Sequence, residues 1–266
     1  MKAGALVLTI PALLLGVVEA GAQERFEWNG TLRSGEVVEV KGISGDIRAV
    51  RSSGSQVEIL ATKHGRRSHF EDVLVKVEEM PDGIVVCAVY GVRPGRDYDC
   101  RSGRNRNRDH DWDWDEIDVS VDFEIRIPDG IEFEGTTVSG DIEVEDLDSR
   151  VTAKAVSGDI AITTDDLAEA STVSGSIDIV MGRADWDGEL SFETVSGDIT
   201  LTFTGELNSE VDFQSLAGDI ESDYPLMLTS SRGGWLSERI RGTIGDGGRR
   251  LHLRTISGDV RVRRGR

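Results

Sequence analysis

The sequence predicts an all-β protein: a parallel β-solenoid (β-helix-like) with coils of about 20 residues and an N-terminal β portion acting as a cap. Three observations support this fold. A pentapeptide of the form VSGDI recurs along the chain, its glycines lie 17 to 22 residues apart from 140 to 218, and the segments around it alternate apolar and polar residues. A repeat of this length is typical of one solenoid coil, and alternation with a period of two indicates strands.

The first 22 residues predict export. They combine Lys2, an apolar run from Ala5 to Val18 and the small residues Ala20-Gly21-Ala22, which is typical of a signal peptide cleaved before Gln23. The run is short for a membrane span and contains Pro11, and no later segment is apolar for long enough. We therefore expect a mature chain without a transmembrane span, located in the periplasm, at the cell surface or outside the cell.

The net charge and the two cysteines indicate which partners and which cellular compartment to expect. The formal net charge of −19 repels nucleic acid and anionic lipid, so no nucleic-acid partner is expected. Cys87 and Cys100 both lie in the exported part, where an oxidising compartment favours a disulfide between them. Two buried or free thiols are the alternative.

Residues 23–130 are predicted to form an N-terminal β region with a charged insertion at 93–116. Only one copy of the motif, ISGDI at 43–47, lies in this region. No helix longer than a turn or two is expected after the signal peptide, and the only candidate is DDLAEAST at 165–172. The strand-like runs are EVVEVKGI (36–43), QVEILATK (56–63), DVLVKVEE (72–79), GIVVCAVYG (83–91) and IDVSVDFEIRIPDG (117–130).

Residues 131–266 are predicted to form the solenoid repeat region. In LSFETVSGDITL (190–201) and LHLRTISGDVRV (251–262) the alternation slips by one residue before the Ser-Gly-Asp, which indicates a corner between two short strands. The 40-residue step from Gly218 to Gly258 is interpreted as two periods, with a degenerate unit around 242–246. The face expected to point inward consists of Val195, Gly197, Ile199 and Leu201, and Ser196 and Asp198 are expected on the other face.

These motifs resemble a known family. The recurring VSGDI units, the IPDG before the first closely spaced copy, and RGTIGDGG followed by LRTISGDV are similar to the bacterial "putative adhesin" β-strand-repeat domain of unknown function. The resemblance covers about residues 30 to 264. It implies an exported or membrane-tethered envelope protein with a β-solenoid-like fold and no established catalytic residues.

The repeated turn residues are interpreted as structural. An Asp that follows Ser-Gly can accept backbone N–H bonds in the turn. The alternative is a column of carboxylates, one per coil, that binds Ca²⁺ or another cation; one Asp per coil is a weak cation site, and Ser176 interrupts the column. The residues are Gly45, Asp46, Gly140, Asp141, Gly158, Asp159, Gly175, Gly197, Asp198, Gly218, Asp219, Gly258 and Asp259.

The segment RSGRNRNRDHDWDWDE (101–116) is the most distinctive interruption of the repeat. One interpretation is a solvated loop whose Arg half pairs with its Asp half, each exposed pair contributing little. A second is a cation site, although Glu116 stands where a calcium loop needs Gly. A third is a ligand patch that binds sugar rings or a partner. The candidate patch residues are Asp111, Trp112, Asp113, Trp114 and Asp115.

No set of residues marks an active site. The four histidines are scattered, and no metal-ligand or nucleophile motif is present. The leading hypothesis is a non-enzymatic envelope module that binds a glycan or a protein. The alternatives are a self-assembling structural solenoid, because solenoid ends expose unpaired strands, and a polysaccharide-active β-helix enzyme. The basic terminus RVRRGR (261–266) is interpreted as a charged end that discourages edge pairing, with contact to anionic polymers or lipid as the alternative.

Overall fold

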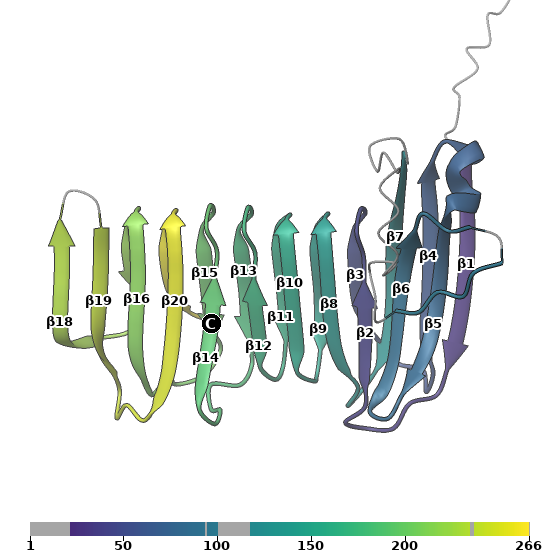
Figure 1. Ribbon diagram of the computed structural model, residues 1–266. Helices are drawn as coiled ribbons and strands as arrows, with labels where there is room; N and C mark the ends of the chain where they lie inside the picture. Colours follow the sequence, from purple (N-terminus) through teal and green to yellow (C-terminus); the bar gives the residue numbers. More distant parts are fainter. Residues whose placement is uncertain (1–21, 94, 101–117, 235–236, 266) are drawn as a thin grey trace, which may run out of the picture.

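Two long β-sheets lie face to face along the molecule (Figure 1). The structure is a computed structural model and describes residues 22–93, 95–100, 118–234 and 237–265. The strands of the described residues, in chain order, are β1 (Ala22–Gly30), β2 (Val37–Lys41), β3 (Ile47–Ser52), β4 (Val57–Gly65), β5 (Val73–Met80), β6 (Gly83–Tyr90), β7 (Val119–Pro128), β8 (Glu132–Ser139), β9 (Ile142–Leu147), β10 (Val151–Ser157), β11 (Ile160–Thr164), β12 (Ala168–Ser171), β13 (Ile177–Met181), β14 (Glu189–Glu193), β15 (Ile199–Phe203), β16 (Ser209–Ala217), β17 (Ile220–Ser222), β18 (Leu226–Gly234), β19 (Ser237–Ile244), β20 (Arg249–Ser257) and β21 (Val260–Arg264). One 3-10 helix, η1 (Arg67–Asp72), precedes β5.

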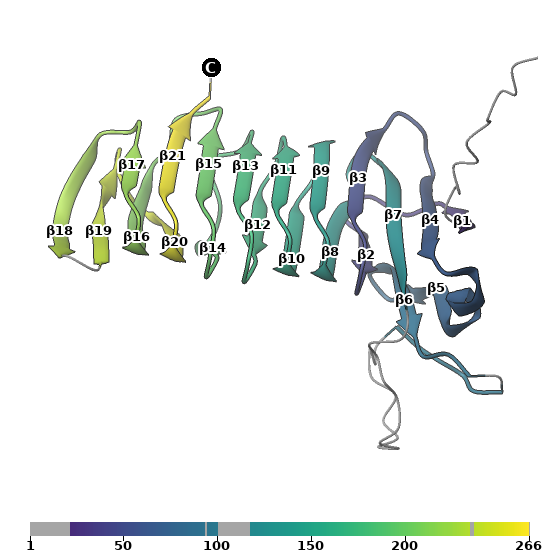
Figure 2. The same ribbon diagram turned by 90° about the horizontal axis from the view of Figure 1, so that it is seen from above.

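We name the sheets A and B. Sheet A has the strand order β1-β4-β7-β3-β9-β11-β13-β15-β21-β17, and sheet B has the order β18-β19-β16-β20-β14-β12-β10-β8-β2-β6-β5. Seven coils each place one strand in sheet B and the next strand in sheet A (Figure 2): β2–β3, β8–β9, β10–β11, β12–β13, β14–β15, β20–β21 and β16–β17. Neighbouring coils pair in parallel, so equivalent residues lie in rows across the stack.

The interior is a set of apolar rows built by this register. Ile160 is the Cα partner of both Ile142 and Ile177, and the same row continues through Ile199 to Val260. All five side chains are at most 1% exposed. One coil cannot bury such a face alone, so the coils stabilise each other. The predicted all-β chain of stacked parallel strands is confirmed, and it is consistent with a β-solenoid.

The C-terminal coil does not lie at the end of the stack. Strand β21 pairs with β15 on one side and β17 on the other, and β20 lies between β14 and β16. The predicted degenerate coil around 242–246 is wrong, because β18 and β19 form an antiparallel hairpin that pairs with the edge of β16. The basic residues 261–264 are not a free tail, since they belong to the interior strand β21. The candidate helix at 165–172 is also wrong, because it contains strand β12.

The first motif copy belongs to the stack. Strands β2 and β3 pair in parallel with β8 and β9, so the coil that contains 43–47 lies directly beside the next coil. Beyond it, β1, β4 and β7 form an antiparallel end of sheet A, and β5 pairs antiparallel with β6 at the end of sheet B. One hydrophobic core runs through both regions. Across the described residues, none of the helical segments has the length and apolar character needed to cross a membrane.

Candidate functional site

The Ser-Gly-Asp turns stack into a continuous corner between the two sheets. Their glycines adopt positive φ values, from +117° at Gly45 to +157° at Gly218. A Cβ atom on Gly158 would lie 1.9 Å from the carbonyl oxygen of Gly140 in the neighbouring coil. Only glycine accommodates both this backbone conformation and this close approach.

The aspartates of the turns form a ladder of hydrogen bonds from coil to coil. The amide of Asp141 donates to Oδ1 of Asp46 at 2.9 Å, and the amide of Asp159 donates to Oδ1 of Asp141 at 2.8 Å. The same bond recurs from Ser176 to Asp159, from Asp259 to Asp198 and from Asp219 to Asp259. At the interruption the hydroxyl of Ser176 accepts the amide of Asp198 at 3.3 Å. One carboxylate oxygen is thus bonded to a backbone amide in each of Asp46, Asp141, Asp159, Asp198 and Asp259.

The ladder starts at Asp122 of β7, whose Oδ1 accepts the amide of Asp46 at 3.1 Å. Sequence analysis missed Asp122, because no Ser-Gly precedes it. Arg261 of β21 binds Asp198 at 2.8 Å and also contacts Asp259. The amide of Asp259 and then Arg261 lower the pKa of Asp198, and Asp198 in turn raises the pKa of Arg261. In this part of the column the chain itself supplies the counter-charge.

A second ladder, made of buried hydroxyl groups, lies just inside the corner. Thr194 is 3% exposed, and its Oγ1 donates to the carbonyl of Gly175 at 3.0 Å. The equivalent bonds run from Thr137 to Gly45, from Thr172 to Gly158, from Thr255 to Gly197 and from Ser215 to Gly258. Ala155 occupies the same position in its coil and has no hydroxyl. Five of the glycine carbonyls thereby gain a side-chain hydrogen-bond donor from a neighbouring coil.

The aliphatic residue of each motif points outward, not into the core. The expectation that Val195 faces inward with Ile199 is wrong, because Val195 is 43% exposed and Ile199 is 0% exposed. The inward position before the corner is taken by Thr194, whose hydroxyl has a buried partner, and strict alternation then places Val195 outside. We call the resulting surface the corner row. Its members are 38–49% exposed and are Val138, Val156, Val173, Val195, Ile256 and Leu216.

The corner row is flanked by two depressions. A trough of about 330 Å³ is lined by Val173, Val195 and Ile256 together with the polar side chains of Glu193 and Arg254. The other depression, at the N-terminal end of the row, has a volume of about 480 Å³ and is lined in part by Ile43, Ser44 and Tyr90.

Tyr90 anchors that end of the row. Its hydroxyl donates to the carbonyl of Ser44 at 3.3 Å, and burial raises its pKa to about 12. The hydrogen bond places the ring beside the first motif copy.

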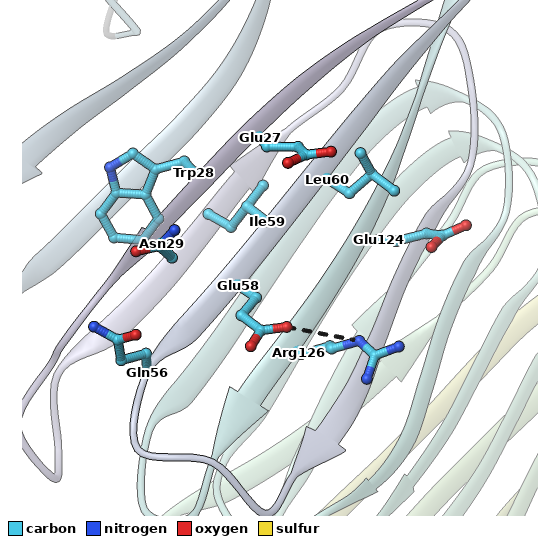
Figure 3. Close-up of a pocket in the computed structure, with 9 residues that line it drawn as sticks. All are labelled: Glu27, Trp28, Asn29, Gln56, Glu58, Ile59, Leu60, Glu124 and Arg126. Atoms are coloured by element: carbon cyan, nitrogen blue, oxygen red, sulfur yellow. Dashed lines mark ion pairs between the residues drawn. The ribbon is translucent and has the colours of Figure 1, made fainter.

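A separate depression lies on the outer face of the antiparallel end of sheet A (Figure 3). It has a volume of about 390 Å³, and Trp28 lies at one side of it. The ring of Trp28 lies over Gly30, where a Cβ atom would be 2.3 Å from the indole Cη2. Of its charged residues, Glu58 and Arg126 lie 3.9 Å apart. Glu27 and Glu124 complete its acidic lining, and sequence analysis did not single out any of these residues.

The other predicted site residues have different outcomes. The disulfide between Cys87 and Cys100 is confirmed. The candidate patch Asp111, Trp112, Asp113, Trp114 and Asp115 lies outside the described residues. In the described ranges, no group of three or more His, Cys, Asp or Glu residues could hold a metal ion. Two of the scattered histidines lie beside carboxylates, His64 at 3.0 Å from Asp122 and His252 at 3.8 Å from Glu193.

The stacked parallel strands and the ladders at their corner define a β-repeat protein. The model of the Toastrack DUF4097 family matches residues 136–263, so this part of the chain is similar to that family. The match begins after the first motif copy, which the structure nevertheless places in the same stack.

The chain also matches several solved structures. One described as a putative cell adhesion protein from Clostridium sporogenes is 7% identical, with 91% of this chain and 100% of that chain covered and a TM-score of 0.43. A putative adhesin from Bacteroides fragilis is 14% identical, with 91% and 98% covered and a TM-score of 0.36. A putative adhesin from Parabacteroides distasonis is 11% identical, with 91% and 98% covered and a TM-score of 0.30. The comparison with curated proteins found no match.

Proposed function

We propose that this chain is an exported, non-enzymatic binding module of the cell envelope that uses the corner row as its contact surface. The carrying observation is that every motif copy keeps an aliphatic residue at a position that leaves it at least partly exposed. Six of these side chains are 38–49% exposed, although the chain has a formal charge of −19. A contiguous exposed apolar patch on a charged protein marks an interaction site.

Contacts within the chain do not explain why the corner row is aliphatic. The core is already filled by the Ile and Val rows on the other side of the backbone, so the corner row contributes little to burial. The turns are held by glycine geometry and by the Asp and Thr ladders, none of which needs an aliphatic neighbour. A contact with another molecule explains the choice of Val, Ile and Leu better than the fold does.

The test is binding to isolated cell-envelope material. The variant Val156→Thr/Val173→Thr/Val195→Thr keeps the shape and the β-branched backbone preference of each side chain and replaces a methyl by a hydroxyl. We expect it to keep the wild-type circular dichroism spectrum and to lose retention on the envelope fraction. The matched control, Val50→Thr/Val180→Thr, alters half-buried valines on the outer face of sheet A and should bind like the wild type. Equal retention of the corner-row variant and the control would refute the proposal.

We also propose that the antiparallel strands β1, β4 and β7 cap the stack, and that residues 23–130 and 131–266 are the two parts of the mature chain. Antiparallel edges with charged side chains limit further strand addition. Removal of the first 22 residues on export is the remaining part of the proposal. N-terminal sequencing of the secreted protein tests it, and a start other than Gln23 would move the cleavage site.

Self-assembly is the second candidate function, because two large apolar side chains are exposed on the edge strand at one end of the stack. Met227 is 65% exposed and Leu228 is 58% exposed on β18, the edge strand of sheet B. A second copy could bury them by extending the sheet. Sedimentation velocity over a range of concentrations tests this candidate, with Met227→Lys/Leu228→Lys as the variant. A wild type that stays monomeric at the highest concentration eliminates it.

A further inference from the structure

We infer that the ligand of the corner row is an extended polysaccharide without negative charge, whose chain runs along the row and therefore across the strands. This inference rests on the proposed function and adds the chemical class of the ligand. It follows from three properties of the corner: the regular spacing of its side chains, the hydrogen bonds of its backbone to neighbouring coils, and its negative charge.

The corner presents two parallel rows with one step per coil. Beside the aliphatic row lies a row of serines, and bridges connect Ser44 with Ser139, Ser157 with Ser174, Ser174 with Ser196 and Ser196 with Ser257. The six members of the corner row are separated by five steps, which at the strand spacing of about 4.8 Å give a row roughly 24 Å long. A surface that repeats in one direction suits a ligand that also repeats in one direction.

Most backbone groups at the corner already bond to neighbouring coils, so the corner offers no continuous edge to a peptide strand. The amide of Gly158 donates to the carbonyl of Ser174 in the next coil, and the amide of Ile160 donates to the carbonyl of Ser176. The carbonyls of Gly158 and Gly175 accept the hydroxyls of Thr172 and Thr194. Strand addition needs unpaired backbone N–H and C=O groups, so recognition here depends on side chains.

The side chains at the corner match the chemistry of a sugar polymer. The exposed Val, Ile and Leu methyl groups suit the C–H faces of sugar rings. Ser157, Ser174 and Ser196 are exposed, and within the described residues their hydroxyls have no protein hydrogen-bond partner, so they are free to bond sugar hydroxyls. The trough of about 330 Å³ beside Val173, Val195 and Ile256 provides depth for the rings.

Charge decides which polymers are accepted. The ladder carboxylates of Asp46, Asp141 and Asp159 are exposed and lie one coil apart beside the serine row. They repel an anionic polymer, and they also repel the same column on a second copy of the chain. A neutral or amino-bearing polysaccharide meets no such repulsion.

The inference is tested with defined polymers. We expect the mature protein to be retained on chitin or cellulose particles and not on a polygalacturonate gel. We expect the dissociation constant for an N-acetylglucosamine or glucose hexamer to be at least about tenfold lower than for the corresponding dimer, since the hexamer contacts several coils at once. Ser157→Ala/Ser174→Ala/Ser196→Ala, which alters only exposed hydroxyls, should weaken retention without changing the circular dichroism spectrum.

The outcomes separate this inference from the proposed function. If the Val→Thr variant loses envelope binding while the wild type binds none of the uncharged polymers, the ligand class is wrong and the proposed function stands. Equal retention on polygalacturonate, or equal affinity for dimer and hexamer, would also overturn the ligand class. If the Val→Thr variant binds the envelope like the wild type, both fail.

Discussion

Ala155 stands where the other coils of the hydroxyl ladder have Thr or Ser. This position allows a direct test of whether the ladder's hydrogen bonds stabilise the corner. In the next coils Thr172 and Thr194 donate to the glycine carbonyls at 3.2 and 3.0 Å, whereas Ala155 leaves the equivalent carbonyl of Gly140 without such a donor. We therefore predict that Ala155→Thr stabilises the protein relative to Ala155→Val, because both add similar bulk and only Thr adds the donor. Ala155 also lines the trough, so the added atoms have room.

The expected magnitude follows from one buried hydrogen bond. Ala155→Thr should exceed Ala155→Val in free energy of unfolding by about 1 kcal/mol. The converse change, Thr194→Val, leaves a buried carbonyl unpaired and should cost about 1–2 kcal/mol. For a chain of this size each kcal/mol shifts the melting temperature by about 2–4 °C.

Urea unfolding followed by circular dichroism, with the disulfide intact, measures all three variants. The comparison of Ala155→Thr with Ala155→Val removes the effect of packing and isolates the hydroxyl. If the two variants unfold at the same urea concentration, and Thr194→Val matches the wild type, the ladder does not stabilise the corner and the reasoning is refuted.

Three further predictions concern the stack as a whole. Gly158→Ala should lower the free energy of unfolding by about 3 kcal/mol or more, because it adds both backbone strain and atomic overlap. The control Gly188→Ala should cost only about 1–2 kcal/mol in the same melting experiment, because Gly188 has a φ of +81° but no atom within 4 Å of the added Cβ. Removal of residues 249–266 should make β16–β19 susceptible to limited proteolysis, because it takes an interior coil from the stack; a protease-resistant truncated protein contradicts the strand order. The pKa of Asp198 is lowered in the folded state, so its contribution to stability is present above the unfolded-state value of about 3.9 and is lost as the pH falls through the lower folded-state value. Asp198→Asn should therefore reduce the acid dependence of unfolding, and Arg261→Gln should do the same; an unchanged pH profile contradicts the ion pair.

Much of the fold could be predicted from the sequence, because one signal was repeated. The motif spacing and the alternation of segments such as 190–201 require stacked parallel strands, and the structure has them. The position of the C-terminal coil could not be predicted, because coils with the same apolar pattern fit beside one another in any order. Contacts outside that pattern favour the observed order, including those of Arg263 with Glu221 at 2.6 Å and with Asp223 at 3.2 Å.

The candidate site was predicted less well, for a reason visible at Val195. Hydrophobicity alone assigns Val195 to the core and Thr194 to the surface. The structure reverses both, because a buried threonine is stable when its hydroxyl has a buried carbonyl to bond. That carbonyl belongs to Gly175 in the preceding coil, so the signal depends on a contact between coils. The alternation up to Thr194 did carry the information, but the apolar character of Val195 outweighed it.

The motif contains positions that the fold explains and positions that it does not. Glycine is fixed by the approach of neighbouring coils, aspartate and threonine by hydrogen bonds to those coils, and the residue after aspartate by the core. Each of these positions is explained by contacts within the chain. The exposed aliphatic position and the serine that follows it have no comparable internal explanation, although they recur with the rest. Selection on a surface contact would keep a methyl-bearing side chain and a hydroxyl at a fixed spacing, and the corner presents this arrangement from coil to coil.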